Sequence, residues 1–330
     1  MQLKNKTIAI KSILNQRLFN KKIPLSISWA LTNRCNKKCF YCNLPNIPSK
    51  ELTTKQIFSV IDELAELGTQ RIGFTGGEPL LREDIDKIVD YSHSKGIFTG
   101  MVSNGSLVKK NIGKIKNLDL LQLSLDGPEE INDKQRYKGS YKYVIDSIKA
   151  SKGKIPKIWL TCVLTKNNLN SIDFVLDLAK QYNLKVFFQP VVDYKNCGLQ
   201  AKTLFPDKKE YKETVKKLIT LKKKNKQIGN SKAGLKYLQN WPIHKKLNCY
   251  AGKLSAHIYP NGDVYSCFNM DGKKPVNCMD NGFKNTFNQL SFKDCEGCWT
   301  YANIEMNYLL NLNLSAGWNS LMLLGNRGRN

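Results

Sequence analysis

The stretch that decides the fold of this 330-residue chain reads Cys35-Asn36-Lys37-Lys38-Cys39-Phe40-Tyr41-Cys42. It follows residues 25–31, where large apolar residues alternate with small ones, a pattern that predicts a β-strand. Thiolates are soft ligands suited to iron–sulfur clusters, and a cubane of four irons normally takes four of them. Three neighbouring thiolates would therefore leave one iron with an open position that can bind and activate a small molecule.

Two other interpretations of the three cysteines stay open at this point. Their positions are spaced i, i+4 and i+7, which would also place them in one buried stripe of a helix, although the polar residues around them are a poor start for one. A zinc site competes more strongly, because Cys-x2-Cys pairs are common zinc signatures. Distant cysteines could supply the fourth zinc ligand.

A second motif, residues 71–80, reads Arg-Ile-Gly-Phe-Thr-Gly-Gly-Glu-Pro-Leu and predicts a short strand, a glycine turn and a helix that begins near Pro79. Glycines let a backbone approach a ligand closely, and proline favours the start of a helix. Alone, the motif fits any strand-to-helix turn. In this order and at this separation, the two motifs together resemble the radical SAM superfamily.

That resemblance implies an enzyme in which Cys35, Cys39 and Cys42 hold a 4Fe–4S cluster and the open iron chelates S-adenosylmethionine (SAM). It also implies cofactor contacts, which map onto Tyr41, Gly76, Gly77, Glu78, Pro79, Ser103, Asn104, Ser124 and Arg136. By position, the Tyr41 backbone would meet the adenine and residues 76–79 would receive the methionine amino group. Residues 103–104 would lie near the ribose, Ser124 would contact SAM, and Arg136 would pair with the SAM carboxylate.

Strand and helix patterns alternate along most of the chain. Apolar, β-rich segments recur at 25–31, 71–75, 98–103, 119–126, 157–165 and 185–192, and helical periodicity falls between them at 54–67, 84–94, 143–150 and 172–182. This alternation predicts parallel βαβ units. Six units suit a partial (β/α)6 TIM-like barrel with ligands at the C-terminal strand ends, and a doubly wound sheet is the alternative.

We expect four regions along the chain. An N-terminal basic and apolar segment (1–23) precedes a radical SAM core (24–193), a lysine-rich linker with helical pattern (194–248) and a small cysteine-rich domain with a C-terminal helix (249–330). In the last region, residues 255–267 predict a hairpin with an Asn-Gly turn at 261–262.

The hairpin would bring Cys249 towards Cys267, and Cys295 and Cys298 form a second close pair. Four thiolates suit a zinc ion or a fully ligated second 4Fe–4S cluster equally well. Their spacing resembles a short, one-cluster form of the SPASM/twitch extensions of radical SAM enzymes, for which we favour the cluster. Cys278 is the substitute ligand. The isolated Cys162 and Cys197 are expected to be structural.

The composition limits the binding partners and the cellular compartment that can be expected for the protein. The chain carries 52 Lys and Arg against 27 Asp and Glu, a formal charge of +25. A basic surface attracts acidic partners, and for this family a flavodoxin or ferredoxin electron donor is implied. Nucleic acid is disfavoured, because the aromatic and glycine patterns of RNA-binding modules are absent. No signal peptide or membrane span is recognised, so we expect reduced thiols in the cytoplasm.

Both ends of the chain are apolar. Residues 1–23 mix isoleucine, leucine and phenylalanine with basic residues, and residues 308–324 are rich in leucine. Either segment could lie on a membrane surface as an interfacial helix, which would make the protein membrane-associated. The alternative is a terminal helix that packs against the barrel or a dimer partner, as apolar stripes usually do.

The resemblance implies reductive cleavage of SAM to a 5′-deoxyadenosyl radical that abstracts hydrogen from a substrate. We expect a peptide or protein substrate, with a sugar, nucleoside, membrane-lipid or lipid-linked substrate as the alternative. No acid or base can be assigned from the sequence. Two hypotheses of other classes stay open: a non-catalytic zinc or iron–sulfur protein that binds RNA, and a two-cluster electron-transfer protein.

Overall fold

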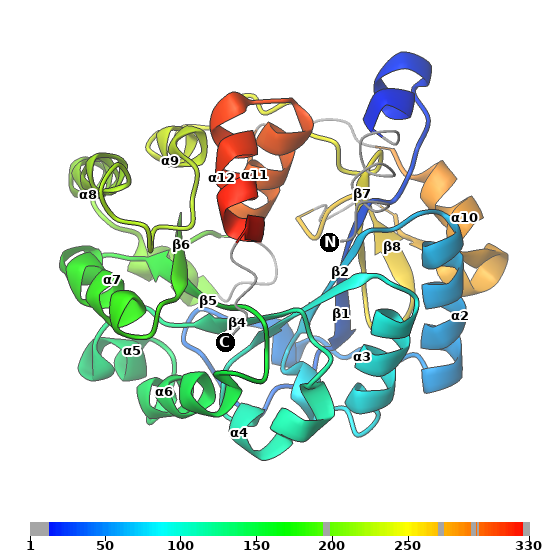
Figure 1. Ribbon diagram of the computed structural model, residues 1–330, viewed down its shortest axis with the longest axis horizontal. Helices are drawn as coiled ribbons and strands as arrows, with labels where there is room; N and C mark the ends of the chain where they lie inside the picture. Colours follow the sequence, from blue (N-terminus) through cyan, green and yellow to red (C-terminus); the bar gives the residue numbers. More distant parts are fainter. Residues whose placement is uncertain (1–12, 194–198, 270–273, 292–294, 296, 326–330) are drawn as a thin grey trace.

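The structure is a computed structural model that describes residues 13–193, 199–269, 274–291, 295 and 297–325. One nine-stranded sheet of order β6-β5-β4-β3-β2-β1-β7-β8-β9 runs through it. The strands from β1 to β6 are parallel and curve into the wall of a partial barrel (Figure 1). The predicted α/β architecture of a partial TIM-like barrel is therefore confirmed.

The six predicted strands all form, close to their predicted bounds. They are β1 (Ser26–Thr32), β2 (Arg71–Gly76), β3 (Phe98–Ser103), β4 (Leu120–Ser124), β5 (Ile158–Leu164) and β6 (Lys185–Pro190). The helices between them are α2 (Thr54–Glu66), α3 (Ile85–Ser94), α4 (Val108–Asn111), α5 (Glu129–Gln135), α6 (Ser140–Ser151) and α7 (Ile172–Gln181). They cover the outer face of the barrel wall (Figure 1).

The two faces of each strand differ in burial. In β2, Ile72 and Phe74 are fully buried in the core, while Arg71, Gly73 and Thr75 on the other face are only half-buried. The outward residues pack under the helices, as hydrophobic burial requires. The inward residues line a barrel interior that remains partly accessible, which leaves room for a ligand.

The C-terminal region continues the same sheet. Strand β7 (Ser255–Ile258) pairs in parallel with β1, and the predicted hairpin joins it to β8 (Asp263–Tyr265), followed by β9 (Val276–Asn277). Gly262 has a φ of +88°, which the hairpin turn requires. The cysteine-rich region predicted at 249–330 is thus joined to the core by main-chain hydrogen bonds.

The barrel is open between β6 and β7. Residues 227–230 extend the β6 edge, where the Val186 amide donates to the Gln227 carbonyl at 2.8 Å. The remaining helices are α8 (Lys208–Leu221), α9 (Lys232–Leu238), α10 (Cys278–Gln289), α11 (Tyr301–Leu310) and α12 (Leu314–Gly325). Of these, α11 begins beside β6, where the Tyr301 amide donates to Gln189 at 3.2 Å.

The two apolar ends of the chain are helical where they are described, over residues 13–19 and in α12. None of the helices in the described part of the chain combines the length and apolar character needed to cross a membrane.

Candidate functional site

The three N-terminal cysteines lie in the loop that follows β1, at the C-terminal edge of the sheet. All three thiols are half-buried, and the Asn104 amide group donates to Cys35 Sγ at 3.6 Å from the end of β3. Burial raises the pKa of Cys35 and Cys42, and raises that of Cys39 to about 11. The charges of Cys42 and Cys35 raise the pKa of Cys39 further, so the three thiols lie close enough to influence one another electrostatically.

The glycines of the second motif are required by the cysteine loop itself. Gly76 has a φ of +117°, and a Cβ there would collide with the Thr32 carbonyl oxygen. A Cβ on Gly77 would collide with the Arg34 carbonyl and lie 2.6 Å from that of Asn33. The Gly77 amide donates to Thr32 at 2.8 Å, and the Glu78 amide donates to Arg34 at 2.8 Å. The glycine turn therefore holds the first part of the cysteine loop.

Glu78 stabilises this turn through hydrogen bonds to its side chain. Its carboxylate is fully buried and accepts hydrogen bonds from the Ser103 hydroxyl at 3.0 Å, the Asn104 backbone amide at 2.9 Å and the Leu80 backbone amide at 3.2 Å. Burial raises its pKa to about 7. Pro79 starts only a short 3-10 helix, Pro79–Leu81. The side chains of Glu78 and Ser103 thus bind each other, which leaves backbone groups here to meet a cofactor.

Arg136 is held by a carboxylate that the sequence interpretation overlooked. Its guanidinium forms a buried ion pair with Asp126, with Nε 2.7 Å from Oδ2, just beyond the end of β4. Asp126 also accepts from the Val163 amide at 2.8 Å and from Gln135 at 2.9 Å. The Arg136 guanidinium lies 5.6 Å from the centre of the Tyr41 ring.

Arg136 also acts on the thiols. Its positive charge opposes the effect of burial on the pKa of Cys39 and Cys42, and so favours their thiolate forms. Ser124, at the end of β4, is half-buried with its side chain on the inward face. Asp126 was within reach of sequence analysis, because it directly follows the apolar β4 pattern at the edge where ligands gather.

A polar and aromatic layer crosses the barrel interior. The Tyr301 hydroxyl, from the start of α11, donates to Gln122 on β4 at 2.7 Å, and its ring stacks on Phe187 of β6 at 4.5 Å. On β2, Arg71 lies 5.8 Å from the centre of the Phe98 ring, and burial lowers its pKa. Burial also lowers the pKa of His257 to about 3. The C-terminal region therefore supplies part of the lining of the barrel.

Four of the five C-terminal cysteines lie close enough to influence one another electrostatically. Burial raises the pKa of Cys249, Cys267 and Cys298, and charges on neighbouring cysteines, Cys295 among them, raise these values further. Cys278 lies outside this group, buried at the start of α10, where its charged neighbours are Glu63, Asp263 and Asp280. Cys162 is buried as expected, and Cys197 lies outside the described residues.

Helix α11 carries two asparagines that the sequence interpretation missed. Asn303 donates to Cys267 Sγ at 3.6 Å, and Asn307 donates to Cys249 Sγ at 3.4 Å. Their i, i+4 spacing puts both on one helix face, and a polar pair on one face of an otherwise apolar helix is the signal that could have found them. Because Tyr301 belongs to the same helix, α11 links the cysteine group to the barrel interior.

Glu305 of α11 gives the stability of the protein a pH dependence. Burial raises its pKa from 4.5 to about 7, and its Oε1 accepts from the Ser231 amide at 2.7 Å. Between these pH values the unfolded chain releases a proton that the folded chain keeps, so stability is full at low pH and falls as pH rises. As the pH rises from about 4.5 to about 8, we expect the free energy of unfolding of Glu305→Gln to increase by about 3 kcal/mol relative to that of the parent, measured by urea unfolding. Free energies of unfolding that depend on pH in the same way in the parent and the variant would contradict this.

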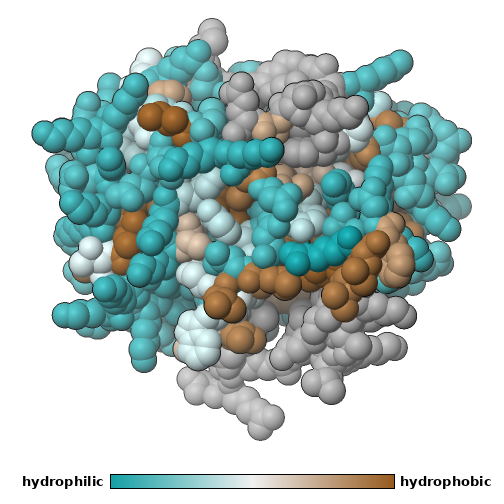
Figure 2. All heavy atoms as spheres, turned by 90° about the horizontal axis from the view of Figure 1, so that it is seen from above, coloured by the Kyte–Doolittle hydropathy of each residue, from teal (hydrophilic) through white to brown (hydrophobic). Residues whose placement is uncertain are grey.

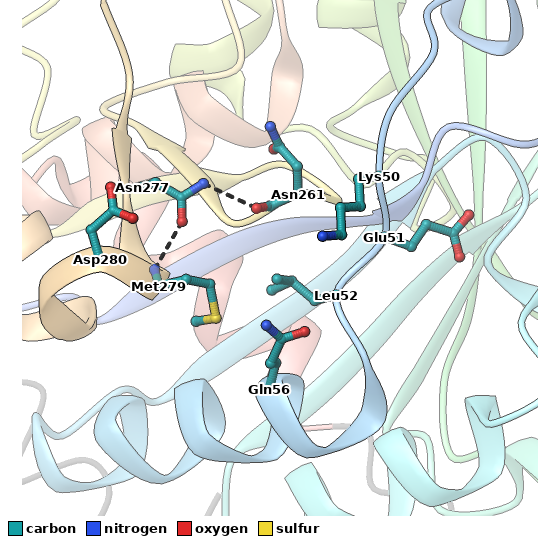
Figure 3. A pocket seen from close by; sticks show the side chains of 8 residues that line it. All are labelled: Lys50, Glu51, Leu52, Gln56, Asn261, Asn277, Met279 and Asp280. Atoms are coloured by element: carbon teal, nitrogen blue, oxygen red, sulfur yellow. Dashed lines mark hydrogen bonds between the residues drawn. The ribbon is translucent and has the colours of Figure 1, made fainter.

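A cavity of about 360 Å³ lies elsewhere, between the N-terminal part of α2 with its preceding loop and the β7–β8 turn, β9 and the start of α10 (Figure 3). It is lined by Lys50, Glu51, Leu52, Gln56, Asn261, Asn277, Met279 and Asp280. Asn277 donates to the Asn261 carbonyl at 3.0 Å, and Glu51 points away from the other side chains to pair with Arg34. The cavity holds none of the predicted site residues, so we do not assign the chemistry to it.

The donor sets fit iron–sulfur chemistry. Each cysteine group offers soft sulfur ligands, half-buried or buried except for the exposed Cys295, with a nearby cation at the first site and amide donors at both. Within the described ranges, no three His, Cys, Asp or Glu side chains converge on one point for a metal ion. Loading either site would therefore require the thiols to turn towards the incoming group.

Sequence comparisons place the chain among known proteins. A profile of the Radical SAM superfamily matches residues 29–179. Fe-coproporphyrin III synthase of Methanosarcina barkeri is 32% identical over 49% of this chain and 43% of that protein. Mycofactocin maturase MftC of Mycolicibacterium smegmatis is 28% identical over 74% of this chain and 64% of its own length. The chain thus spans less than two thirds of both named relatives.

An uncharacterized protein of Methanocaldococcus jannaschii, MJ0907, is 31% identical over 76% of this chain and 86% of that protein. Solved structures share the fold. SuiB of Streptococcus suis bound to S-adenosylmethionine superposes with a TM-score of 0.66 at 18% identity, over 84% of this chain and 68% of SuiB. The enzyme anSMEcpe with bound AdoMet and a peptide gives 0.65 at 20% identity, over 86% and 83%.

Proposed function

Because this chain belongs to the radical SAM superfamily, we propose that Cys35, Cys39 and Cys42 hold a 4Fe–4S cluster whose open iron binds SAM. The observation that carries the proposal is the glycine turn at 76–77, which fixes the cysteine loop by direct backbone contact. When bound, the cluster and SAM supply a 5′-deoxyadenosyl radical for hydrogen abstraction.

The chain's own residues would position these groups. Glu78, Ser103 and the Asn104 amide keep the C-terminal ends of β2 and β3 together, so that backbone groups of residues 76–79 and 103–104 face the cofactor. Asp126 fixes the Arg136 guanidinium, whose charge favours the thiolates and is placed to attract the SAM carboxylate. Ser124 and the Tyr41 backbone complete the proposed contacts.

We propose a peptide or protein as the substrate. A relative named as a mycofactocin maturase and the structural similarity to SuiB, which has been solved bound to the precursor peptide SuiA, support this choice. The partly accessible barrel interior offers space for a segment of such a substrate. Arg71 in that interior, with a pKa lowered by burial, would be stabilised by an acidic group on the substrate. A cytoplasmic flavodoxin or ferredoxin is the proposed electron donor.

The substrate class is tested by the rate of 5′-deoxyadenosine formation. Reduced, reconstituted protein is given SAM and either a pooled synthetic peptide library or pooled sugars, nucleosides and coproporphyrin III, the last because one relative is named for an iron form of it. We expect the peptide pool to accelerate the reaction and a peptide to lose a pair of hydrogen atoms by mass. Acceleration by a small-molecule pool alone would replace the peptide proposal.

At the C-terminal site we propose a second 4Fe–4S cluster held by Cys249, Cys267, Cys295 and Cys298, with zinc as the alternative. The amide donors on α11 support a redox-active group, because hydrogen bonds to the sulfurs stabilise the reduced state of a cluster. The cluster would exchange electrons with the substrate or bind it. Iron counting on the Cys249→Ala/Cys298→Ala variant tests the assignment: loss of about four irons is expected, and loss of zinc would favour the alternative.

Asn303→Ala should lower the reduction potential of this second cluster. Its side chain donates to Cys267, and removing the donor destabilises the more negative, reduced state by an amount on the order of 60 mV, a tenfold change in a one-electron equilibrium. The matched control is Asn311→Ala on the same helix, because Asn311 donates to the Asn248 and Asn307 carbonyls. Equal potentials in the two variants, measured by redox titration with EPR detection, would refute a tuning role.

A further inference from the structure

The helix at residues 13–19 contacts the C-terminal end of α11, and α12 follows α11 directly. These three helices and the residues that join α11 to α12 are defined here as the terminal face. The Arg17 guanidinium donates to the Leu310 carbonyl at 2.6 Å, and Ile13 packs on the small apolar cluster that contains Leu310. Seen from above, apolar side chains gather in a band on this side of the molecule (Figure 2).

The terminal face holds most of the large apolar side chains that the described part of the chain exposes. Nine of thirteen are there: Leu14, Leu18, Phe19, Leu309, Leu312, Leu314, Trp318, Leu321 and Met322. On α12, residues 314, 318, 321 and 322 share one side of the helix, while Ala316 and Asn319 on the other side are buried. The helix is therefore anchored by one side and presents an apolar stripe to solvent, with Leu314 89% and Trp318 66% exposed.

The sequence around this face is basic. Residues 1–22 and 306–330 contain eight Lys and Arg and no Asp or Glu, and of these Arg17, Lys21 and Lys22 lie in the described part of the chain. Glu305, just before the second range, is engaged by the Ser231 amide. Two further lysines hold α12 in place: Lys222 Nζ donates to Asn319 at 2.8 Å, and Lys157 Nζ donates to the Leu323 carbonyl at 2.8 Å. The exposed apolar stripe thus lies on elements whose described charged side chains, apart from the engaged Glu305, are basic.

We propose that the terminal face docks on an anionic lipid surface. The apolar side chains would enter the interface between headgroups and acyl chains, while the basic residues attract the negative headgroups. A second copy of the chain is a poorer occupant of the face, because it would bring two sets of positive charges together in a protein of net charge +25.

The test is vesicle flotation of the full-length protein. Vesicles of phosphatidylcholine alone are compared with vesicles containing about one third phosphatidylglycerol, at physiological salt and at about 1 M salt. We expect binding to the anionic vesicles at least tenfold stronger than to the neutral ones, and loss of that advantage at high salt. Trp318 emission should shift to shorter wavelength on binding and lose its access to iodide.

The variants are Leu18→Ser/Trp318→Ser on the terminal face and Ile243→Ser as a matched control, since Leu18 and Ile243 are both 71% exposed. We expect the double variant to bind anionic vesicles at least tenfold more weakly, and the control to bind as the parent does. Thermal unfolding verifies that both remain folded. Equal binding of parent and double variant would overturn the proposal, as would a parent dimer, seen by sedimentation velocity, that the same double variant dissociates.

Discussion

Replacing Gly77 by alanine is expected to abolish the chemistry while sparing the fold. The added Cβ would collide with the carbonyl of Arg34 and crowd that of Asn33, in the segment that leads directly into the cysteine loop. The loop must shift, and misplacement of reacting groups by about 1 Å can cost about 100-fold in rate. We therefore expect the iron content at this site to fall and reductive SAM cleavage to decrease by at least about 100-fold.

The matched control is Gly73→Ala in β2, the strand that leads into the glycine turn. A Cβ at Gly73 meets nothing nearer than the Ile27 carbonyl at 3.9 Å, an ordinary contact. This variant should load iron and cleave SAM within a few-fold of the parent. If Gly77→Ala also loaded a full cluster and cleaved SAM at the parent rate, the glycine turn would not position the cysteine loop.

The second large effect concerns the buried ion pair between Asp126 and Arg136. Asp126→Asn keeps the shape of the side chain but removes the charge that compensates Arg136, and it places an amide donor among groups that already donate. Breaking a buried pair on one side typically costs about 3–5 kcal/mol. We expect a loss of that size in the free energy of unfolding, measured by urea titration.

Asp146→Asn provides the comparison, because Asp146 pairs at 2.9 Å with Lys142, whose side chain is 74% exposed. Surface pairs contribute about 0–1 kcal/mol, so this variant should lose little. A loss of under about 1 kcal/mol for Asp126→Asn as well would mean that Arg136 finds another partner and that the pair does not organise this side of the site.

Local pattern was enough to predict the six parallel strands and four of the helices between them, α2, α3, α6 and α7, but not the short α4 and α5. In β2 the alternation of buried Ile72 and Phe74 with inward residues follows directly from the sequence, because a strand has a period of two. The hairpin turn at 261–262 was equally predictable, since a Gly at positive φ suits it. The two cysteine groups were predicted from spacing and chain order, and their role as cluster ligands stays a prediction; Cys278 is surrounded by Glu63, Asp263 and Asp280 rather than by other cysteines.

Roles that depend on distant partners were beyond the sequence. Glu78 and Ser103 are predicted cofactor contacts, and the hydrogen bond between them, which joins two different βα units, could not be foreseen from either local pattern. The place of Asp126 at a strand end could be recognised from the sequence, but its ion pair with Arg136 could not, because the pair forms only when α5 folds back on that strand end. Tyr301 lies far along the chain from the barrel strands, so no periodicity could place it inside the barrel.

The most direct test of the central claim is SAM cleavage by the reconstituted protein under anaerobic reduction. Iron, sulfide and 5′-deoxyadenosine are measured for the parent and for the Cys35→Ala/Cys39→Ala/Cys42→Ala variant. The account predicts 5′-deoxyadenosine from the parent and none from the variant, together with a loss of about four irons. An intact parent cluster that does not cleave SAM, in a protein that binds RNA in a salt-dependent manner, would contradict the account and favour a non-catalytic iron–sulfur protein.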